Sequence, residues 1–132
     1  MILGVGADLC AVERMKKLLD DSAFLQRYFH PEEQFYIRSR GALSASSMAG
    51  CFAAKEAFVK ALGVGFSGIK PEDIIICHRE SGAPYYALSG SAELAAREAG
   101  VINTHLSITH DGGMALAFAV LEGEGHAADS DT

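Results

Sequence analysis

The sequence predicts an α+β domain in which one long central helix packs on antiparallel strands and hairpins. A continuous helical pattern from Ser44 to Leu62 ends at Gly63, the residue type preferred just after a helix. Two pairs of strand-like segments each flank a glycine-containing turn. Because the helices are grouped between antiparallel hairpins and do not alternate with single strands, a doubly wound parallel sheet is excluded.

The N-terminal third predicts a strand followed by short helices. The segment MILGVGADL, residues 1–9, forms the strand and carries Asp8 near its end. Apolar residues at helical spacing follow at Val12, Met15, Leu18 and Leu19. Ser22 is suited to cap a second short helix, and Pro31 is suited to the first turn of a further one.

The second half of the chain predicts two hairpins separated by a short helix. The predicted elements are strands over 74–78 and 85–88 around the turn RESGAP, a helix over 91–99, and strands over 105–110 and 114–122 around DGG.

Composition and length exclude several classes of protein. A chain of 132 residues has the size of one domain, placed at residues 1–122, and the polar residues 123–132 are expected to form a disordered tail. A net charge of −6 argues against nucleic-acid binding. Without a membrane-length apolar run or a signal peptide, we expect a cytoplasmic protein with no membrane partner. Three widely spaced cysteines favour reduced thiols.

Residues Gly63 to Gly68 match the G-x-G-x-x-G pattern of dinucleotide-binding loops. That function requires a strand before the glycines and a helix after them. Here a helix precedes the glycines and a strand follows them. The pattern therefore indicates a helix end and a loop.

The segment KEAFVK places charged groups on a largely apolar helix face. Lys55 lies near the middle of that face, where an unpaired amine would be costly. Glu56 lies at its edge, and Lys60 is one turn further on. A surface ion pair would explain Glu56 and Lys60, but it would not explain Lys55. Two lysines around one glutamate suit a site for an anion and a divalent cation.

The last predicted hairpin carries a second polar group. His110 shares a strand face with Leu106 and Ile108, and Asp111 opens the turn. Taken alone, a turn-forming aspartate and a histidine at a strand end explain this pattern without any function.

Four stretches in order resemble one family: GVGADLCAVERM, FHPEE, FAAKEAFVKALGVG and LSITHDGGMALAFAVLE. The chain is similar, from residue 2 to residue 122, to holo-[acyl-carrier-protein] synthases, the short bacterial 4′-phosphopantetheinyl transferases. The resemblance implies the 4′-phosphopantetheinyl transferase fold and a homotrimer with active sites between protomers. It also implies a reaction in which 4′-phosphopantetheine moves from coenzyme A to a serine of an apo acyl carrier protein, releasing adenosine 3′,5′-bisphosphate. This step activates carriers for fatty-acid or polyketide synthesis.

The resemblance also implies residue roles. Asp8 and Glu56 match a Mg²⁺ site, which suits an ion that prefers one or two protein carboxylates. Together with Lys55, whose place on the apolar helix face suits an anion, we assign to coenzyme A the residues Lys60, Gly63, Gly65 and His110. Lys60 matches the lysine at the pyrophosphate, and His110 matches the histidine beside the phosphates.

The base that accepts the serine proton is left open between Asp111, Glu56 and a metal-bound water. We favour Asp111, so the expected catalytic residues are Glu56, Lys60, His110 and Asp111. One position departs from the family, where many members carry an arginine that binds the 3′-phosphate of the cofactor. Here that position is Cys51, and the nearby arginines that could replace it are Arg38, Arg40 and Arg79.

Acyl carrier proteins are acidic, so docking on a chain of net charge −6 requires a local basic patch. We predict this patch on the first helix at Arg14, Lys17 and Leu18, extended by Arg27 on the next helix. The resemblance agrees, because the family's partner docks on the first helix. Solvating surface charges are the alternative explanation.

Two other functions fit parts of the pattern. A module that only binds coenzyme A or a nucleotide would keep the lysines but would need none of Asp8, Glu56 and Asp111. A coenzyme A pyrophosphohydrolase would usually gather more carboxylates than KEAFVK offers. The presence of all three carboxylates favours the transferase.

Overall fold

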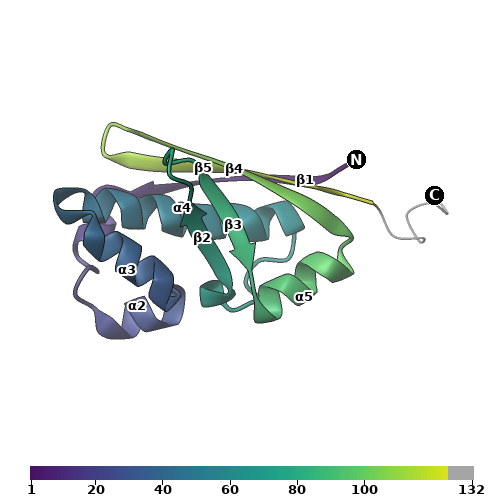
Figure 1. Ribbon diagram of the computed structural model, residues 1–132, viewed down its shortest axis with the longest axis horizontal. Helices are drawn as coiled ribbons and strands as arrows, with labels where there is room; N and C mark the ends of the chain where they lie inside the picture. The colour runs from purple at the N-terminus through teal and green to yellow at the C-terminus, as the bar shows by residue number, and fades with distance from the viewer. Residues whose placement is uncertain (125–132) are drawn as a thin grey trace.

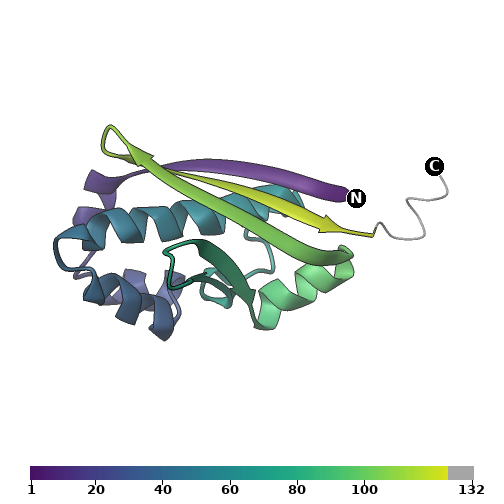
Figure 2. The ribbon, with the colours of Figure 1, turned by 45° about the horizontal axis from the view of Figure 1, so that its top comes forward.

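The computed structural model describes residues 1–124 and confirms the α+β architecture (Figure 1). The elements are β1 Ile2–Ala11, α1 Val12–Lys16, α2 Ser22–Tyr28, α3 Pro31–Ser39, α4 Ser44–Leu62, β2 Ile74–His78, β3 Pro84–Leu88, α5 Gly90–Glu98, β4 Val101–Asp111 and β5 Met114–Gly123. An antiparallel sheet in the order β1–β5–β4 forms one layer, and α4 lies along its inner face (Figures 1 and 2). The hairpin β2–β3 and helices α2, α3 and α5 cover the other side of α4.

The long helix has the predicted bounds and ends as expected at Gly63. The backbone of Gly63 is left-handed, with φ 79°, and its N–H donates to the carbonyl oxygens of Val59 and Lys60. Because the sheet covers one side of α4 and the remaining elements cover the other, the helix is buried around most of its circumference. The expectation of a single apolar face was therefore too narrow.

Several predicted boundaries differ from those in the structure, and three of the differences matter most. Helix α1 ends at Lys16, so Leu18 follows it in a turn whose N–H donates to the Met15 carbonyl. The cap of α2 is Asp21, whose side chain accepts from the Phe24 N–H. Strand β4 begins at Val101 because it pairs with the whole length of β5 up to Gly123. Gly123 thus belongs to the sheet, the Glu124 N–H donates to the Gly100 carbonyl oxygen, and residues 125–132 of the predicted tail lie outside the described residues.

Strand β1 approaches α4 more closely than any side chain would permit. A Cβ added to Gly4 would overlap the carbonyl oxygen of Ala61, and one added to Gly6 would overlap that of Ala57. Small residues also face each other along the rest of this contact: Ala45, Ala49, Ala53, Ala57 and Ala61 on α4, and Ala115, Ala117 and Ala119 on β5. This close packing holds the first half of β1, at Gly4 and Gly6, against the C-terminal half of α4.

The opposite face of the sheet is apolar and exposed. We call it the outer sheet face and define it by Val5, Leu9, Leu116 and Phe118. Phe118, the largest of these side chains, keeps 46% of its surface exposed. A contiguous apolar surface of this kind is typical of a protein–protein contact. Within the described residues, no helix is long and apolar enough to span a bilayer.

Candidate active site

The side chain of Asp8 projects from β1 toward α4 and meets Lys60. The Lys60 Nζ donates to Asp8 Oδ1 at 2.8 Å and to the Ala7 carbonyl at 3.3 Å. The Asp8 side chain is 18% exposed and that of Lys60 is 54% exposed, so this pair lies at the surface. The hydrogen bond to Asp8 raises the pKa of Lys60, which keeps the amine charged.

Glu56 lies beside this pair and is half-buried. Burial raises its pKa, and the negative charge of Asp8 raises it further. The two carboxylates are thus close enough to repel each other, and a divalent cation between them would remove that repulsion. Among residues 1–124, no group of three or more His, Cys, Asp or Glu side chains forms a metal cage. Two carboxylates completed by water and substrate oxygens are nevertheless the set that Mg²⁺ prefers, so the residues fit this ion.

Lys55 has a different role from the one the sequence predicted. Its side chain is 1% exposed, and its Nζ donates to Glu33 Oε1 at 2.7 Å and to the carbonyl oxygens of Pro71 and Ile74. An ammonium group has three N–H donors, so all of them are engaged. The prediction that Lys55 binds coenzyme A is therefore wrong for this structure.

The partner of Lys55 is Glu33, a buried acid whose importance was missed. Glu33 also accepts the backbone N–H groups of His30 at 2.9 Å and Ile76 at 3.0 Å. Burial raises the pKa of Glu33 and lowers the pKa of Lys55, and the attraction between the two charges opposes both shifts. The pair joins α3, α4 and β2. The acidic start of α3, in HPEE, was the available signal, but it also suits an ordinary first helical turn.

His110 lies near the other end of α4. Its Nε2 is 2.8 Å from the Ser46 carbonyl oxygen, and because that oxygen can only accept, Nε2 carries the proton. A Cβ added to Gly50 would lie 3.4 Å from His110 Nε2, so the glycine makes room for the ring. Ser46 and Glu56 are separated by about 15 Å along the helix axis.

The structure therefore brings together Asp8, Glu56 and Lys60 but places His110 elsewhere in the same chain. Asp111 follows His110 at the exposed end of β4, opposite Met114. One chain thus presents two separate polar groups. We call Asp8, Glu56 and Lys60 the carboxylate half and His110 and Asp111 the histidine half.

Comparison with known proteins assigns this arrangement to a family. The sequence model described as the 4′-phosphopantetheinyl transferase superfamily matches residues 4–119. The chain belongs to this superfamily. It is 44% identical over 123 residues to a holo-[acyl-carrier-protein] synthase of Treponema denticola, covering 93% of this chain and 100% of that protein.

Solved structures of holo-[acyl-carrier-protein] synthases share the fold. The protein from Neisseria meningitidis superposes with a TM-score of 0.83 at 32% identity, covering 92% of this chain and 99% of the other. The protein from Bacillus anthracis, solved in complex with CoA (3′,5′-ADP), superposes with a TM-score of 0.77 at 32% identity, covering 94% and 99%. These similarities confirm the predicted family and its fold.

The loop that follows α4 lies one turn beyond Lys60. Gly63 and Gly65 have φ values of 79° and 63°, a conformation that favours glycine, and a Cβ on either would meet open space. Both glycines are exposed at the same end of α4 as the carboxylate half. Their predicted contact with coenzyme A stays a prediction.

The residues of the predicted docking patch have the following surroundings, and their contact with a carrier protein stays a prediction. The Arg14 guanidinium lies 4.8 Å from the centre of the Phe52 ring, and that of Arg27 lies 5.7 Å from the Tyr28 ring. Lys17 is exposed, whereas Leu18 is half-buried against the core. The charge of Arg14 also acts on the Glu56 carboxyl and lowers its pKa against the effect of burial. Arg14 therefore lies near the carboxylate half.

Proposed function

We propose that this chain transfers 4′-phosphopantetheine from coenzyme A to a serine of an apo acyl carrier protein, as a Mg²⁺-dependent holo-[acyl-carrier-protein] synthase. The observation that supports this most strongly is the meeting of Asp8, Glu56 and Lys60, which combines two carboxylates and an exposed amine. Breaking a pyrophosphate requires charge neutralisation on its oxygens. The identity of the substrates follows from the family and from relatives that are named holo-[acyl-carrier-protein] synthases.

The residues of the chain divide the work of this reaction. The serine oxygen attacks the phosphorus attached to the pantetheine, and the bond from that phosphorus to the bridging oxygen of adenosine 3′,5′-bisphosphate breaks. Asp8 and Glu56 would hold Mg²⁺, which would supply charge neutralisation on the pyrophosphate. Lys60 leaves Asp8 and donates to a pyrophosphate oxygen, while Asp111 takes the serine proton and His110 donates to a phosphate.

The active site is completed by a second copy of the chain in a homotrimer. Two features support this part of the proposal. The carboxylate half and the histidine half are separated in one protomer, and a neighbouring protomer supplies the missing half. The outer sheet face is an apolar surface whose burial against a partner would be favourable at about 25 cal/mol for each Å².

The acidic carrier protein docks on the patch formed by Arg14, Lys17 and Arg27. Because Arg14 is close enough to Glu56 for its charge to lower the pKa of that carboxyl, a carrier bound on this patch brings its serine to the carboxylate half. We place all of these functions in one domain, residues 1–122, of a protein that works in the cytoplasm.

The proposed function is tested by intact mass spectrometry of an apo acyl carrier protein after incubation with this protein, coenzyme A and Mg²⁺. We expect the carrier to gain the mass of one phosphopantetheine group and the gain to disappear when the metal is chelated. Asp8→Ala should abolish the gain, whereas Glu13→Ala, which removes an exposed acid on α1, should not. Hydrolysis of coenzyme A with an unmodified carrier would support a pyrophosphohydrolase, and binding without reaction would support a binding module.

A further inference from the structure

A small pocket opens between the start of α4, the hairpin β2–β3 and the end of β4. Its volume is about 220 Å³. The residues that line it are Tyr36, Arg40, Ser47, Gly50, His78, Gly82, Pro84, Ile108 and His110. Complete cofactor sites usually measure about 300–1,000 Å³, so this pocket has room for one part of a larger ligand.

The charge of the pocket differs from that of the whole chain. The chain carries a net charge of −6, yet the described residues that line the pocket include one arginine and two histidines and no acid. The Arg40 guanidinium donates to the Ser47 hydroxyl at 3.3 Å. Within residues 1–124, it pairs with no carboxylate. Its charge is therefore available for an anion.

His78 adds an unused polar atom beside Arg40. Its ring stacks on Tyr36 with the ring centres 4.0 Å apart and the planes at 9°. In the part of the chain that the structure describes, His78 Nδ1 is a buried side-chain atom without a hydrogen-bond partner. Buried polar atoms are normally paired, so an unpaired one beside a pocket indicates a site for a further group.

The pocket thus offers two places for anions. Arg40 lies near His78, and His110, the predicted phosphate contact, lines the same pocket. A ligand with two separate phosphates matches this arrangement. Adenosine 3′,5′-bisphosphate, the product of the proposed reaction, is such a ligand, and the Bacillus anthracis relative is described in complex with CoA (3′,5′-ADP).

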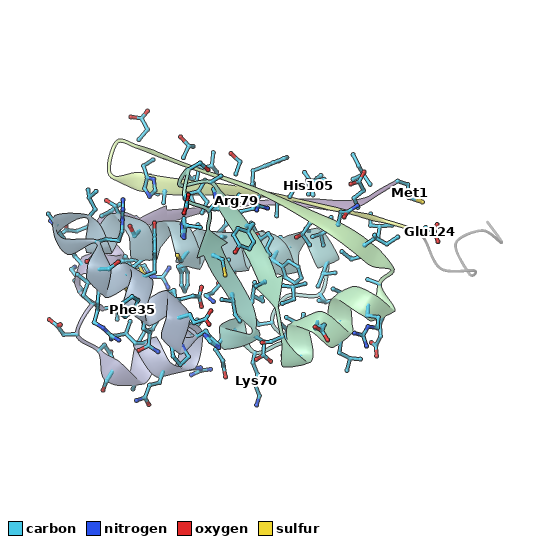
Figure 3. The ribbon with its side chains drawn as sticks, in the orientation of Figure 1. Met1, Phe35, Lys70, Arg79, His105 and Glu124 are labelled. Carbon is cyan, nitrogen blue, oxygen red and sulfur yellow. The ribbon has the colours of Figure 1, made fainter. Side chains whose placement is uncertain are left out.

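We propose that Arg40, supported by His78, binds the 3′-phosphate of coenzyme A and selects the 3′-phosphorylated cofactor. This inference rests on the proposed function. It assigns to Arg40 the task that Cys51 cannot perform, because the Cys51 thiol is buried and burial raises its pKa, so it stays uncharged. The other two arginines considered are less suitable. Arg38 lines a different pocket, and Arg79, at the β2–β3 turn in Figure 3, lies 4.6 Å from the Tyr85 ring and does not line this one.

Calorimetric titration with two nucleotides tests the assignment without any reaction. The wild-type protein should bind adenosine 3′,5′-bisphosphate about tenfold or more tightly than adenosine 5′-monophosphate, because a charged hydrogen bond to the 3′-phosphate is added. Arg40→Gln should bring this affinity ratio close to one, because it should weaken the binding of the bisphosphate and not that of the monophosphate. Arg40→Lys should keep part of the preference. Arg38→Gln and Arg79→Gln are the matched controls, and both should keep the wild-type ratio.

Kinetic measurements with coenzyme A and dephospho-coenzyme A provide a second test of the Arg40 assignment. Arg40→Gln should raise KM for coenzyme A and leave KM for dephospho-coenzyme A unchanged. A wild-type ratio near one, retention of the ratio by Arg40→Gln, or its loss in Arg79→Gln would overturn the assignment. Inorganic phosphate that binds as tightly as the bisphosphate would also overturn it, because the pocket would then be a site for free phosphate.

These outcomes separate the inference from the proposed function. If the carrier is modified but Arg40→Gln keeps the nucleotide preference, only the assignment of Arg40 fails. If the carrier is never modified but the preference depends on Arg40, the proposed transfer fails and the phosphate subsite stands.

Discussion

Lys55 and Lys60 lie five positions apart on one helix, yet their surroundings give them opposite roles. Lys55 is enclosed and bonded to Glu33 and two backbone carbonyls. Lys60 is half-exposed and bonded to Asp8, a residue whose charge also acts on Glu56. The first lysine holds elements of the fold together, and the second stands where a substrate can reach it.

The difference shows that a motif does not assign roles to its own residues. KEAFVK contains both lysines, but the acid that meets each one comes from another segment, Glu33 from FHPEE and Asp8 from GVGAD. A buried amine with all three donors engaged cannot move to a ligand without leaving a buried carboxylate unpaired. An exposed amine with one acid partner can exchange that partner for a phosphate at little cost.

The largest expected effect is on stability and concerns Lys55. Lys55→Met should lower the free energy of unfolding by about 3–5 kcal/mol, because Glu33 would keep its burial and lose its partner. The matched variant Lys60→Met should change it by no more than about 0.5 kcal/mol, since it removes an exposed pair. Urea denaturation measures both values.

Replacing both members of the buried pair sharpens this prediction. Glu33→Leu combined with Lys55→Met should be more stable than Lys55→Met alone, because no charge is left buried. If Lys55→Met lowers the free energy of unfolding by less than about 1 kcal/mol, the pair with Glu33 does not stabilise the fold in the way proposed.

The next effect concerns the close contact between β1 and α4, which positions Asp8 near Lys60. Gly6→Ala should lower the free energy of unfolding by about 3 kcal/mol, because its Cβ would overlap the Ala57 carbonyl oxygen. Any folded fraction should also transfer phosphopantetheine poorly, since β1 must move away from α4. Thermal unfolding and a transfer assay measure the two losses, and wild-type stability in this variant would mean that the close approach is not required.

Lys60→Ala should act on turnover and not on stability. We expect kcat/KM to fall about 100-fold, mainly through kcat, because Lys60 donates to charge that grows in the transition state. The unfolding midpoint should stay that of the wild type. A change in KM for coenzyme A with kcat unchanged would instead make Lys60 a binding residue without a share in the chemistry.

The smallest expected effect is at the docking patch. Arg14→Glu should raise KM for the acyl carrier protein about tenfold and leave KM for coenzyme A nearly unchanged. The control is Arg97→Glu, a charge reversal on α5 at an exposed arginine paired with Glu93. Salt should weaken the wild-type interaction more than that of the Arg14 variant. Equal KM values for the two variants at low salt would place the docking surface elsewhere.

Much of the fold followed from local sequence signals. The apolar periodicity and the glycine after Leu62 determined α4, and the turn signals determined both hairpins. The long-range contacts did not follow. Alanine at every fourth position of α4, together with Gly4 and Gly6, was a readable sign of close packing, but nothing local states which strand approaches that helix.

The candidate site was predictable to a similar degree. The resemblance placed Asp8, Glu56 and Lys60 together, and the structure agrees. The KEAFVK pattern also suggested Lys55 as a cofactor contact, but in the structure Lys55 is paired with the buried Glu33. The separation of His110 from Glu56 could not be read from the sequence, because it depends on where β4 ends relative to α4.

That separation carries the central claim, which is that two protomers build each active site, and mixing two inactive variants tests it directly. Lys60→Ala lacks the carboxylate half and keeps the histidine half, whereas Asp111→Ala keeps the carboxylate half and lacks the histidine half. After dissociation and random reassembly in equal amounts, about a quarter of the shared sites should contain both intact halves. The mixture should therefore recover about a quarter of the wild-type transfer activity. A mixture no more active than the mean of the two separate variants would show that each site is built within one chain, and it would contradict this account.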